Sequence, residues 1–251
     1  MLIELSPTTL LRRILLPFLL VGSLVFLKAN PRVVKVGVFP NAPAVFMGED
    51  GIARGFYPDM LREVAAKEGW DLQFVPGTWQ EGLDRIRSGE ISLLSMVART
   101  PEREAYLDYG AESSFTVWSL LYARPKSGIE SVLDVQNRHV GLMKGDVNGD
   151  HFRNLCAGFN LPVVYETFGS FEDVFRAVES GHLDAGVVTN TFGYSQESRF
   201  RVERTSVVFS PFNVYFAVGR GRDPDLLKAL DAYLREGRQD QASGYHHALK
   251  R

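Results

Sequence analysis

The chain has 251 residues, of which 45% are hydrophobic and 23% are charged, with 28 Lys and Arg against 30 Asp and Glu. This is an ordinary globular composition, and it excludes a disordered, collagen-like or purely coiled-coil chain. There is no basic excess, which argues against a nucleic-acid partner. The one cysteine, Cys156, can form neither an internal disulfide nor a cysteine-rich zinc site.

Residues 1–29 have the pattern of an export signal. Arg12 and Arg13 precede an apolar run over residues 14–27, and this order is typical of a signal peptide or signal anchor. The run is shorter than the roughly 20 residues of a spanning helix, and Leu27 fits the small-residue cleavage motif poorly. A cleaved signal, an uncleaved anchor and a buried N-terminal helix therefore stay open. We expect the rest of the protein to be periplasmic or otherwise extracytoplasmic.

From residue 33 the sequence alternates between strand and helix patterns. We predict strands in three short apolar runs, at residues 33–39, 71–75 and 91–98. A helix starting near Pro58 is expected to end at Gly69. A second helix starts at Thr78, which forms a capping-box spacing with Glu81, and ends at Gly89.

The same order recurs in the second half. Strands are predicted at residues 140–143, 161–165 and 183–188. One intervening helix has a buried stripe of Phe152, Leu155, Cys156 and Phe159. The other begins at Ser170 and ends at Gly181. In both halves a helix ends on Ser-Gly, one polar residue follows, and a strand begins, as in residues 85–94 and 177–186.

These repeated βαβ units predict an α/β fold class with two lobes. Each lobe is expected to be a mostly parallel sheet flanked by helices. Residues 207–218 form another strand-like segment, and Asp223 with Pro224 is expected to cap a following helix.

The carboxyl ends of parallel strands are where α/β folds bind ligands. If the two lobes face each other, one cleft is lined by Asn41, Ala98, Arg99, Arg103, Lys144, Asp146, Thr189 and Asn190. The sequence lacks a Gly-x-Gly-x-x-Gly or Gly-Lys-Ser/Thr phosphate loop, a His-Glu-x-x-His metal motif and a Gly-x-Ser-x-Gly elbow. We therefore expect no cofactor, no metal site and no catalytic residues.

Six short sequence motifs occur in a characteristic order along the chain. They are Val36-Gly-Val, Gly55-Phe-Tyr-Pro-Asp-Met-Leu, Ser88-Gly-Glu-Ile, Thr100-Pro-Glu-Arg103, Val140-Gly-Leu-Met-Lys-Gly and Gly181-His-Leu-Asp-Ala. In this order the chain resembles the family 3 bacterial extracellular solute-binding proteins from about residue 33 to residue 250. Three more phrases resemble the periplasmic sensor modules of membrane-bound histidine kinases and diguanylate cyclases. They are Asn41-Ala-Pro-Ala-Val-Phe-Met, Gly77-Thr-Trp-Gln-Glu-Gly-Leu and Ser210-Pro-Phe-Asn-Val-Tyr-Phe-Ala.

The resemblance implies two lobes joined by two hinge crossovers, near Trp118 and Ser210. One lobe would comprise residues 32–117 plus 211–251, and the other residues 118–210. In this family, ligand binding closes the lobes by hinge bending.

The resemblance also implies roles for several residues. Arg103 matches the family arginine that clamps a ligand carboxylate, although a surface arginine paired with a neighbouring glutamate is the alternative. Ala98, Asp146 and Thr189 replace the Ser or Thr, the Thr and the Asp that amino-acid binders use, so a standard α-amino acid is a doubtful ligand. Asp146 either supplies an anionic partner or repels a carboxylate.

Aromatic and basic residues complete the predicted site. Phe46, Trp79 and Trp118 are expected in or near the cleft, as ligand walls or as plain core. Arg99 and Lys144 add positive charge and, with Arg103, favour an anionic or zwitterionic ligand.

The predicted function is the binding of a small polar metabolite, for sensing or for uptake. The partners would be a membrane sensor kinase, a cyclase or an ABC permease. A periplasmic dehydratase-like enzyme on the same fold, with Asp146 as its general acid or base, is the alternative.

Overall fold

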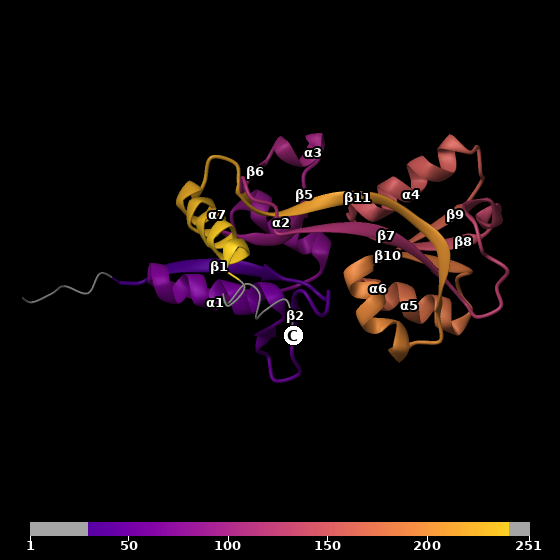
Figure 1. Cartoon of the computed structure of the whole chain (residues 1–251), viewed down its shortest axis with the longest axis horizontal. Coiled ribbons are helices and arrows are strands. Elements are labelled where there is room, and N and C mark those ends of the chain that lie inside the picture. Colours follow the sequence, from indigo (N-terminus) through magenta and orange to yellow (C-terminus); the bar gives the residue numbers. More distant parts are fainter. Residues whose placement is uncertain (1–29, 241–251) are drawn as a thin grey trace, which may run out of the picture. The chain divides into compact units, whose positions relative to one another are not determined.

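The computed structural model describes residues 30–240, and Figure 1 traces their elements. A first group consists of strands β1 (Arg32–Val38), β4 (Trp70–Pro76) and β5 (Leu94–Ala98) with helices α1 (Phe56–Glu68) and α2 (Trp79–Ser88). β1 and β4 pair in parallel, with Val36 opposite Phe74. A parallel bridge between Val36 and Leu93 places the start of β5 on the other side of β1. The predicted strand and helix order of the first half is confirmed.

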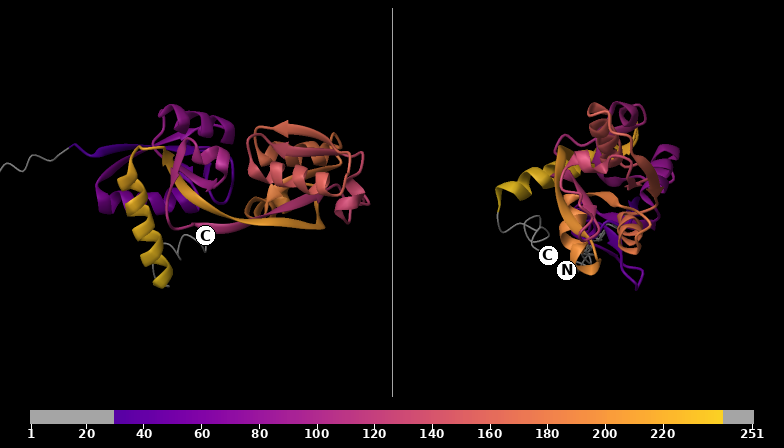
Figure 2. Two further views of the ribbon diagram at one scale, coloured as in Figure 1. Left: turned by 90° about the horizontal axis from the view of Figure 1, so that it is seen from above. Right: turned by 90° about the vertical axis from the view of Figure 1, so that its right-hand side faces the viewer.

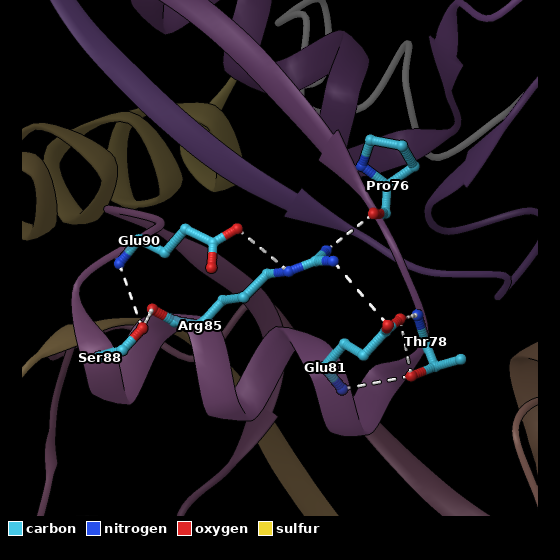
Figure 3. Close-up of polar contacts among 6 residues, drawn as sticks. All are labelled: Pro76, Thr78, Glu81, Arg85, Ser88 and Glu90. Carbon is cyan, nitrogen blue, oxygen red and sulfur yellow. Dashed lines mark hydrogen bonds and ion pairs between the residues drawn. The ribbon is translucent and has the colours of Figure 1, made fainter.

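The predicted capping box fixes the start of α2. The Glu81 backbone N–H donates to Thr78 Oγ1 over 3.2 Å, and Glu81 Oε2 accepts from the Thr78 N–H over 2.7 Å. The hydrogen bonds that the Thr78 N–H and the Thr78 hydroxyl donate to this carboxylate hold the pKa of Glu81 below its usual value. Figure 3 shows Arg85, one turn further on, reaching the Pro76 carbonyl at 2.8 Å and the Glu90 carboxylate at 3.3 Å. The cap therefore sets the position of Trp79, the first residue of the helix.

The second half repeats this arrangement. It contains strands β8 (His139–Met143), β9 (Val164–Phe168) and β10 (Ala185–Thr189), with helices α4 (Val147–Gly158), α5 (Phe171–Ser180) and α6 (Asn190–Gln196). β8 pairs in parallel with both β9 and β10. As predicted, Ser170 accepts from the Asp173 N–H at the start of α5, and Gly181 ends the helix in the left-handed conformation.

Two long antiparallel strands connect the halves. β7 (Phe115–Ala123) and β11 (Glu203–Gly219) lie side by side and extend from the first group of elements into the second (Figures 1 and 2). The strand order of this sheet is β5-β11-β7-β10-β8-β9. The register in which β11 pairs with β7 shifts between Phe209 and Phe212, where Ser210 adopts a φ of 47°. The irregularity coincides with the sequence position predicted for one crossover.

Shorter elements fill the connections. They are strands β2 (Phe46–Met47), β3 (Ala53–Arg54) and β6 (Leu107–Tyr109), helix α3 (Pro101–Glu104), 3₁₀ helices η1 (Val132–Val135) and η2 (Glu197–Arg199), and helix α7 (Pro224–Gln239). α7 packs against α1 and β11. Asp223 precedes α7 as predicted, but its carboxylate binds Arg32 and makes no side-chain cap hydrogen bond.

The two-lobed α/β fold class predicted from the sequence is confirmed, with parallel strand pairs in each half and antiparallel pairs along β7 and β11. Two local predictions are wrong. The strand expected at residues 161–165 begins at Val164, because Pro162 has no N–H to donate to a strand ladder. Phe159, expected on a buried helix face, follows the end of α4 and is 54% exposed. The exact lobe boundaries, at residues 117/118 and 210/211, stay a prediction.

The apolar core does not follow the division into lobes. One cluster of buried side chains runs from Val34 in β1 through Trp79 in α2 to Phe171 and Phe175 in α5. A second cluster lies under α4 and contains Phe152 and Cys156. The two lobes are therefore packed against each other through a continuous apolar contact.

The predicted export signal at residues 1–29 lies outside the described residues, as does the end of the chain from residue 241. Over residues 30–240, no helix has the length and apolar character required to cross a membrane.

Candidate ligand-binding site

The predicted strand ends enclose a small cavity. Its lining includes Asn41 after β1, Trp79 of α2, Ala98 at the end of β5, Arg103 after that strand, Asp146 after β8 and Thr189 at the end of β10. These are six of the residues predicted from the strand ends and from the resemblance, and they come from both halves of the chain. The cavity volume is about 20 Å³, which is close to the space that a single water needs.

Arg103 is the buried cation of this cavity, with 6% of its surface exposed. Thr100 caps the short helix α3 by accepting from the Arg103 N–H over 3.2 Å, which directs the arginine side chain back toward the end of β5. Its guanidinium donates to the Ala98 carbonyl over 3.0 Å and to the Gly145 carbonyl over 2.8 Å. Arg103 therefore joins the β5 end to the turn after β8.

Trp79 contacts the same turn. Its Nε1–H donates to the Gly145 carbonyl over 2.9 Å, and its ring meets Phe39 edge-on at a centroid distance of 4.7 Å. The Arg103 guanidinium lies 5.5 Å from the indole, a cation–π distance. The carbonyl of Gly145 therefore accepts from two donors across the space between the halves.

Asp146 is the acidic group of the cavity. Burial raises the pKa of its carboxyl to about 6, although the hydrogen bond from Asn148 and the charge of Arg103 act in the opposite direction. The Asn148 amide donates to Asp146 Oδ2 over 2.6 Å, and its own oxygen accepts from the Ser119 hydroxyl over 2.6 Å. A polar chain therefore runs from β7 to the cavity carboxylate.

Asn41 and Met96 form another unusual part of the lining. Asn41 is 3% exposed, and its Oδ1 has no hydrogen-bond partner among the described residues. Its amide nitrogen lies 3.5 Å from the sulfur of Met96, which holds a φ of 58° within β5. A non-glycine residue in this region costs roughly 1–3 kcal/mol, and such strain concentrates at functional sites.

The other predicted site residues do not line this cavity. Arg99 pairs with Glu104 at 3.4 Å and lies over the ring of Tyr109. Asn190 is buried, and its side-chain oxygen accepts a hydrogen bond from the Trp118 backbone N–H over 3.0 Å. Their ligand roles stay predictions.

Two more of the predicted residues lie elsewhere on the protein. Lys144 has an exposed side chain. Phe46 lines two larger grooves, with volumes of about 590 and 730 Å³, outside the cavity. The roles proposed for Phe46 and Lys144 also remain predictions.

Several lining residues were not predicted from the sequence. Asn148, Met96 and Phe171 all contribute to the cavity. Asn148 lies two positions after Asp146, and its place in the first turn of α4 was the available signal. The strain at Met96 has no sequence signal, because it arises from the irregular pairing of β5 with β11.

Over residues 30–240, no group of three or more His, Cys, Asp or Glu side chains is placed to hold a metal ion. The donors of the cavity, a guanidinium, an indole N–H and carboxamides, suit a small polar organic molecule.

This arrangement, in which strand ends from two lobes meet around a buried arginine, is that of a solute-binding protein. Residues 34–244 match the family model of the bacterial extracellular solute-binding proteins, family 3. The chain belongs to that family, which confirms the resemblance drawn from its motifs, and the family is one of extracellular proteins.

Individual relatives support the same assignment. The arginine-binding extracellular protein ArtP of Bacillus subtilis strain 168 is 22% identical over 135 residues, which are 53% of this chain and 52% of ArtP. The match thus spans about half the length of that curated relative. An ancestral arginine-binding protein bound to arginine superposes with a TM-score of 0.77 at 23% identity, covering 88% of this chain and 98% of that one.

A sensor protein has the same fold. A histidine kinase sensor domain with similarity to periplasmic binding proteins gives a TM-score of 0.76 at 20% identity, and covers 88% of this chain and 96% of the sensor domain. The predicted likeness to sensor modules is therefore confirmed at the level of the fold.

Proposed function

We propose that this protein binds a small polar metabolite that carries a carboxylate, outside the cytoplasm, and that its lobes close around the ligand. The observation that supports this most directly is Arg103, a buried arginine whose guanidinium lies in a cavity lined by the ends of strands from both halves. Over residues 30–240 its guanidinium donates only to two neutral carbonyls, and a buried cation with such partners is a strong site for an anion. Charge-assisted bonds to a carboxylate are roughly twice as strong as neutral ones.

The size of the cavity supports a mechanism of opening and closing. A volume of about 20 Å³ is far below what a metabolite requires, so the ligand enters only after the lobes separate. The motion would bend β7 and β11 near Ser210, where the register already shifts. A ligand carboxylate then takes the place of the Gly145 carbonyl at Arg103.

Closure of the lobes is the step by which ligand binding would be signalled to a partner protein. A ligand shifts the equilibrium toward the closed form only by its preference for that form. Because Arg103 and Trp79 both contact Gly145 across the interlobe space, a ligand that bridges these groups favours closure. The closed form would then be recognised by a membrane sensor kinase, a cyclase or an ABC permease. The likeness to a kinase sensor domain supports the sensing role.

A ligand screen by thermal shift tests the proposal, with free amino acids and small organic acids as ligands. Binding at 100 times Kd adds about 2.7 kcal/mol to the free energy of unfolding, so a true ligand produces a clear rise in Tm. Calorimetry then gives its Kd. A flat screen, with no compound raising Tm, would count against carboxylate binding.

An enzymatic role is the second candidate, and one observation favours it. Asp146 lines the cavity together with Arg103, and its pKa of about 6 suits a general acid or base near neutral pH. A dehydratase-like reaction would then act on the bound acid. Turnover of a prephenate-like acid by the wild-type protein, lost in Asp146→Asn, would establish this role, and binding without turnover would exclude it for that acid.

A further inference from the structure

The long strand β11 is kinked where it crosses between the lobes. Phe209 pairs with Ser119 of β7. Phe212, three positions later, pairs with Val117, which is only two positions away on β7. The extra residue on β11 forms a β-bulge, which bends the strand. Ser210 lies inside the bulge with a φ of 47°, and such a conformation persists only where the surrounding structure holds it.

Helix α4 contacts both flanks of this kink through consecutive side chains. Phe152, which is fully buried in the second apolar cluster, packs against Phe209 at a ring-centroid distance of 5.5 Å. His151 meets Phe212 edge-on at a centroid distance of 5.3 Å. The flank before the kink is therefore anchored in an apolar core, whereas the flank after it contacts a titratable ring.

The ring of His151 is poorly placed to carry a charge. Its Nδ1 is buried and has no hydrogen-bond partner among residues 30–240. A protonated imidazole carries a hydrogen on both ring nitrogens, so Nδ1 would become a buried donor without an acceptor, which is unfavourable. Burial accordingly lowers the pKa of His151, although the charge of Asp150 acts in the opposite direction.

The charged groups near this ring are on its own helix. Asp150 directly precedes it and is the charge that acts on its pKa. Residues 207–214 of β11 and 115–121 of β7 include no charged or titratable side chain. The carboxyl of Asp146, at the start of α4, has a pKa of about 6 and accepts a hydrogen bond from Asn148. An effect of pH on the kink would therefore come from His151 or from Asp146, and substitutions can separate the two.

We infer that His151 is a pH-sensitive latch on the kink: the neutral ring holds Phe212 in place, and protonation turns the ring out to water and loosens this part of β11. The released ring binds a proton more tightly than the packed ring does. The contact is therefore complete above the ordinary imidazole pKa of 6.5 and is lost as the pH falls below that value, through the lowered pKa of the packed ring. The inference rests on the proposed function only in placing the bending motion at this kink, which would bend more easily in acid.

Amide hydrogen exchange of the full chain, without any ligand, tests the latch. Exchange in residues 207–214 of β11 is followed by mass spectrometry at pH 5 and pH 8 and corrected for the intrinsic rate at each pH. We expect corrected exchange in this segment to be about fivefold faster or more at pH 5, and that of β8 in the same lobe to change less than about twofold. Equal changes in both segments, or no change in residues 207–214, would overturn the inference. A flat ligand screen would defeat the proposed function without altering this result.

Matched substitutions separate His151 from the other titrating groups. His151→Phe keeps a ring against Phe212 but cannot take up a proton, so exchange in residues 207–214 should become independent of pH. His182→Phe, at an exposed histidine that pairs with Glu166, is the matched control and should keep the wild-type response. Asp146→Asn should keep it as well. Retention of the response in His151→Phe, or its loss in Asp146→Asn, would overturn the inference.

The titration of His151 itself answers the question if His151→Phe does not fold. NMR of the wild-type imidazole signals gives the midpoint, which we expect below 6.5 because burial disfavours the charged ring. Phe212→Ala should raise this midpoint toward 6.5, since it opens the space beside Nδ1 to water. A wild-type midpoint at or above 6.5, or one that Phe212→Ala leaves in place, would overturn the latch.

Discussion

The two sides of the cavity hold their charges by different means. Arg103 is bound to main-chain carbonyls, those of Ala98 and Gly145, whereas Asp146 is bound to a side-chain relay through Asn148. Backbone carbonyls are present at every residue, so the hydrogen bonds of Arg103 depend on the course of the backbone. The relay depends on the identity of particular side chains. The partners of the cation are therefore set by the course of the backbone, and the partner of the anion is set by the identity of a side chain.

The largest expected effect comes from removing the cation. Arg103→Ala should weaken any ligand that carries a carboxylate by 100-fold or more, because a buried charge-assisted hydrogen bond pair is lost. Arg99→Ala is the matched control, since Arg99 is exposed and pairs with Glu104 outside the cavity. Its effect on Kd, measured by calorimetry, should stay within about twofold. Equal losses in both variants would remove the distinction between Arg103 and its neighbour.

Removing the Asp146 carboxylate should raise the stability of the folded protein. The folded-state pKa of Asp146 is raised from 3.8 to about 6, so the folded protein binds the proton more tightly than the unfolded chain does. This favours the folded state at low pH, and the advantage is lost as the pH rises from about 4 to 6. Above pH 6, Asp146→Asn should raise the free energy of unfolding by roughly 2–3 kcal/mol.

Urea unfolding at pH 5 and pH 8 checks this sign, with Asp71→Asn at an exposed position of β4 as the control. The gain in Asp146→Asn should be larger at pH 8. A loss of stability at pH 8 would show that the Arg103 charge outweighs burial at this site.

The turn at Gly145, which contacts Arg103 and directly precedes Asp146, is tested by replacing the glycine with alanine. Gly145 and Gly69 have the same φ of 71°, so an alanine at either position should cost about 1–2 kcal/mol in strain. A Cβ at Gly145 would meet the flexible end of Gln80 and, at an ordinary contact distance of 3.6 Å, the Leu83 side chain, whereas one at Gly69 would meet nothing within 4 Å. The two stability losses should therefore be similar. Ligand affinity should fall several-fold only in Gly145→Ala, because its carbonyl meets Arg103 and Trp79. Equal changes in affinity would contradict a role of this turn in binding.

The smallest effect is expected at the indole. Trp79→Phe removes one of the two donors to the Gly145 carbonyl while Arg103 still binds it, so the cost should be about 1 kcal/mol or less. Trp118→Phe, outside the cavity, serves as the control. A thermal melt of each variant measures the difference. A loss in Trp79→Phe as large as that in Arg103→Ala would mean that the indole, and not the guanidinium, joins the two halves.

Local signals account for most of what the sequence could predict of the fold. The caps at Thr78, Ser170, Gly89 and Gly181 depend on neighbouring residues only, and all four form as expected. The pairing of β7 with β11 depends on residues about 90 positions apart in sequence and has no local signal. The repeated βαβ units predicted two lobes, but the two crossovers between the lobes were predicted only from the resemblance to the family.

The candidate site also contains some residues that the sequence could predict and others that it could not. The rule that ligands lie at strand ends placed Asn41, Arg103 and Asp146 correctly around one cavity. It could not say which way each side chain turns. Arg99, next to a strand end, turns toward Tyr109, since Glu104 is placed to accept from it. Asn148 was missed because its importance comes from a hydrogen bond with Ser119, a residue of a different element.

The apolar cluster that runs from β1 into α5 makes the proposed opening sensitive to temperature. Separation of the lobes would expose side chains such as Phe171 to water, and the free-energy cost of that exposure becomes smaller on cooling. A receptor built in this way should spend more time open in the cold. Its ligand would then have to supply more of the closing free energy at low temperature than at high temperature.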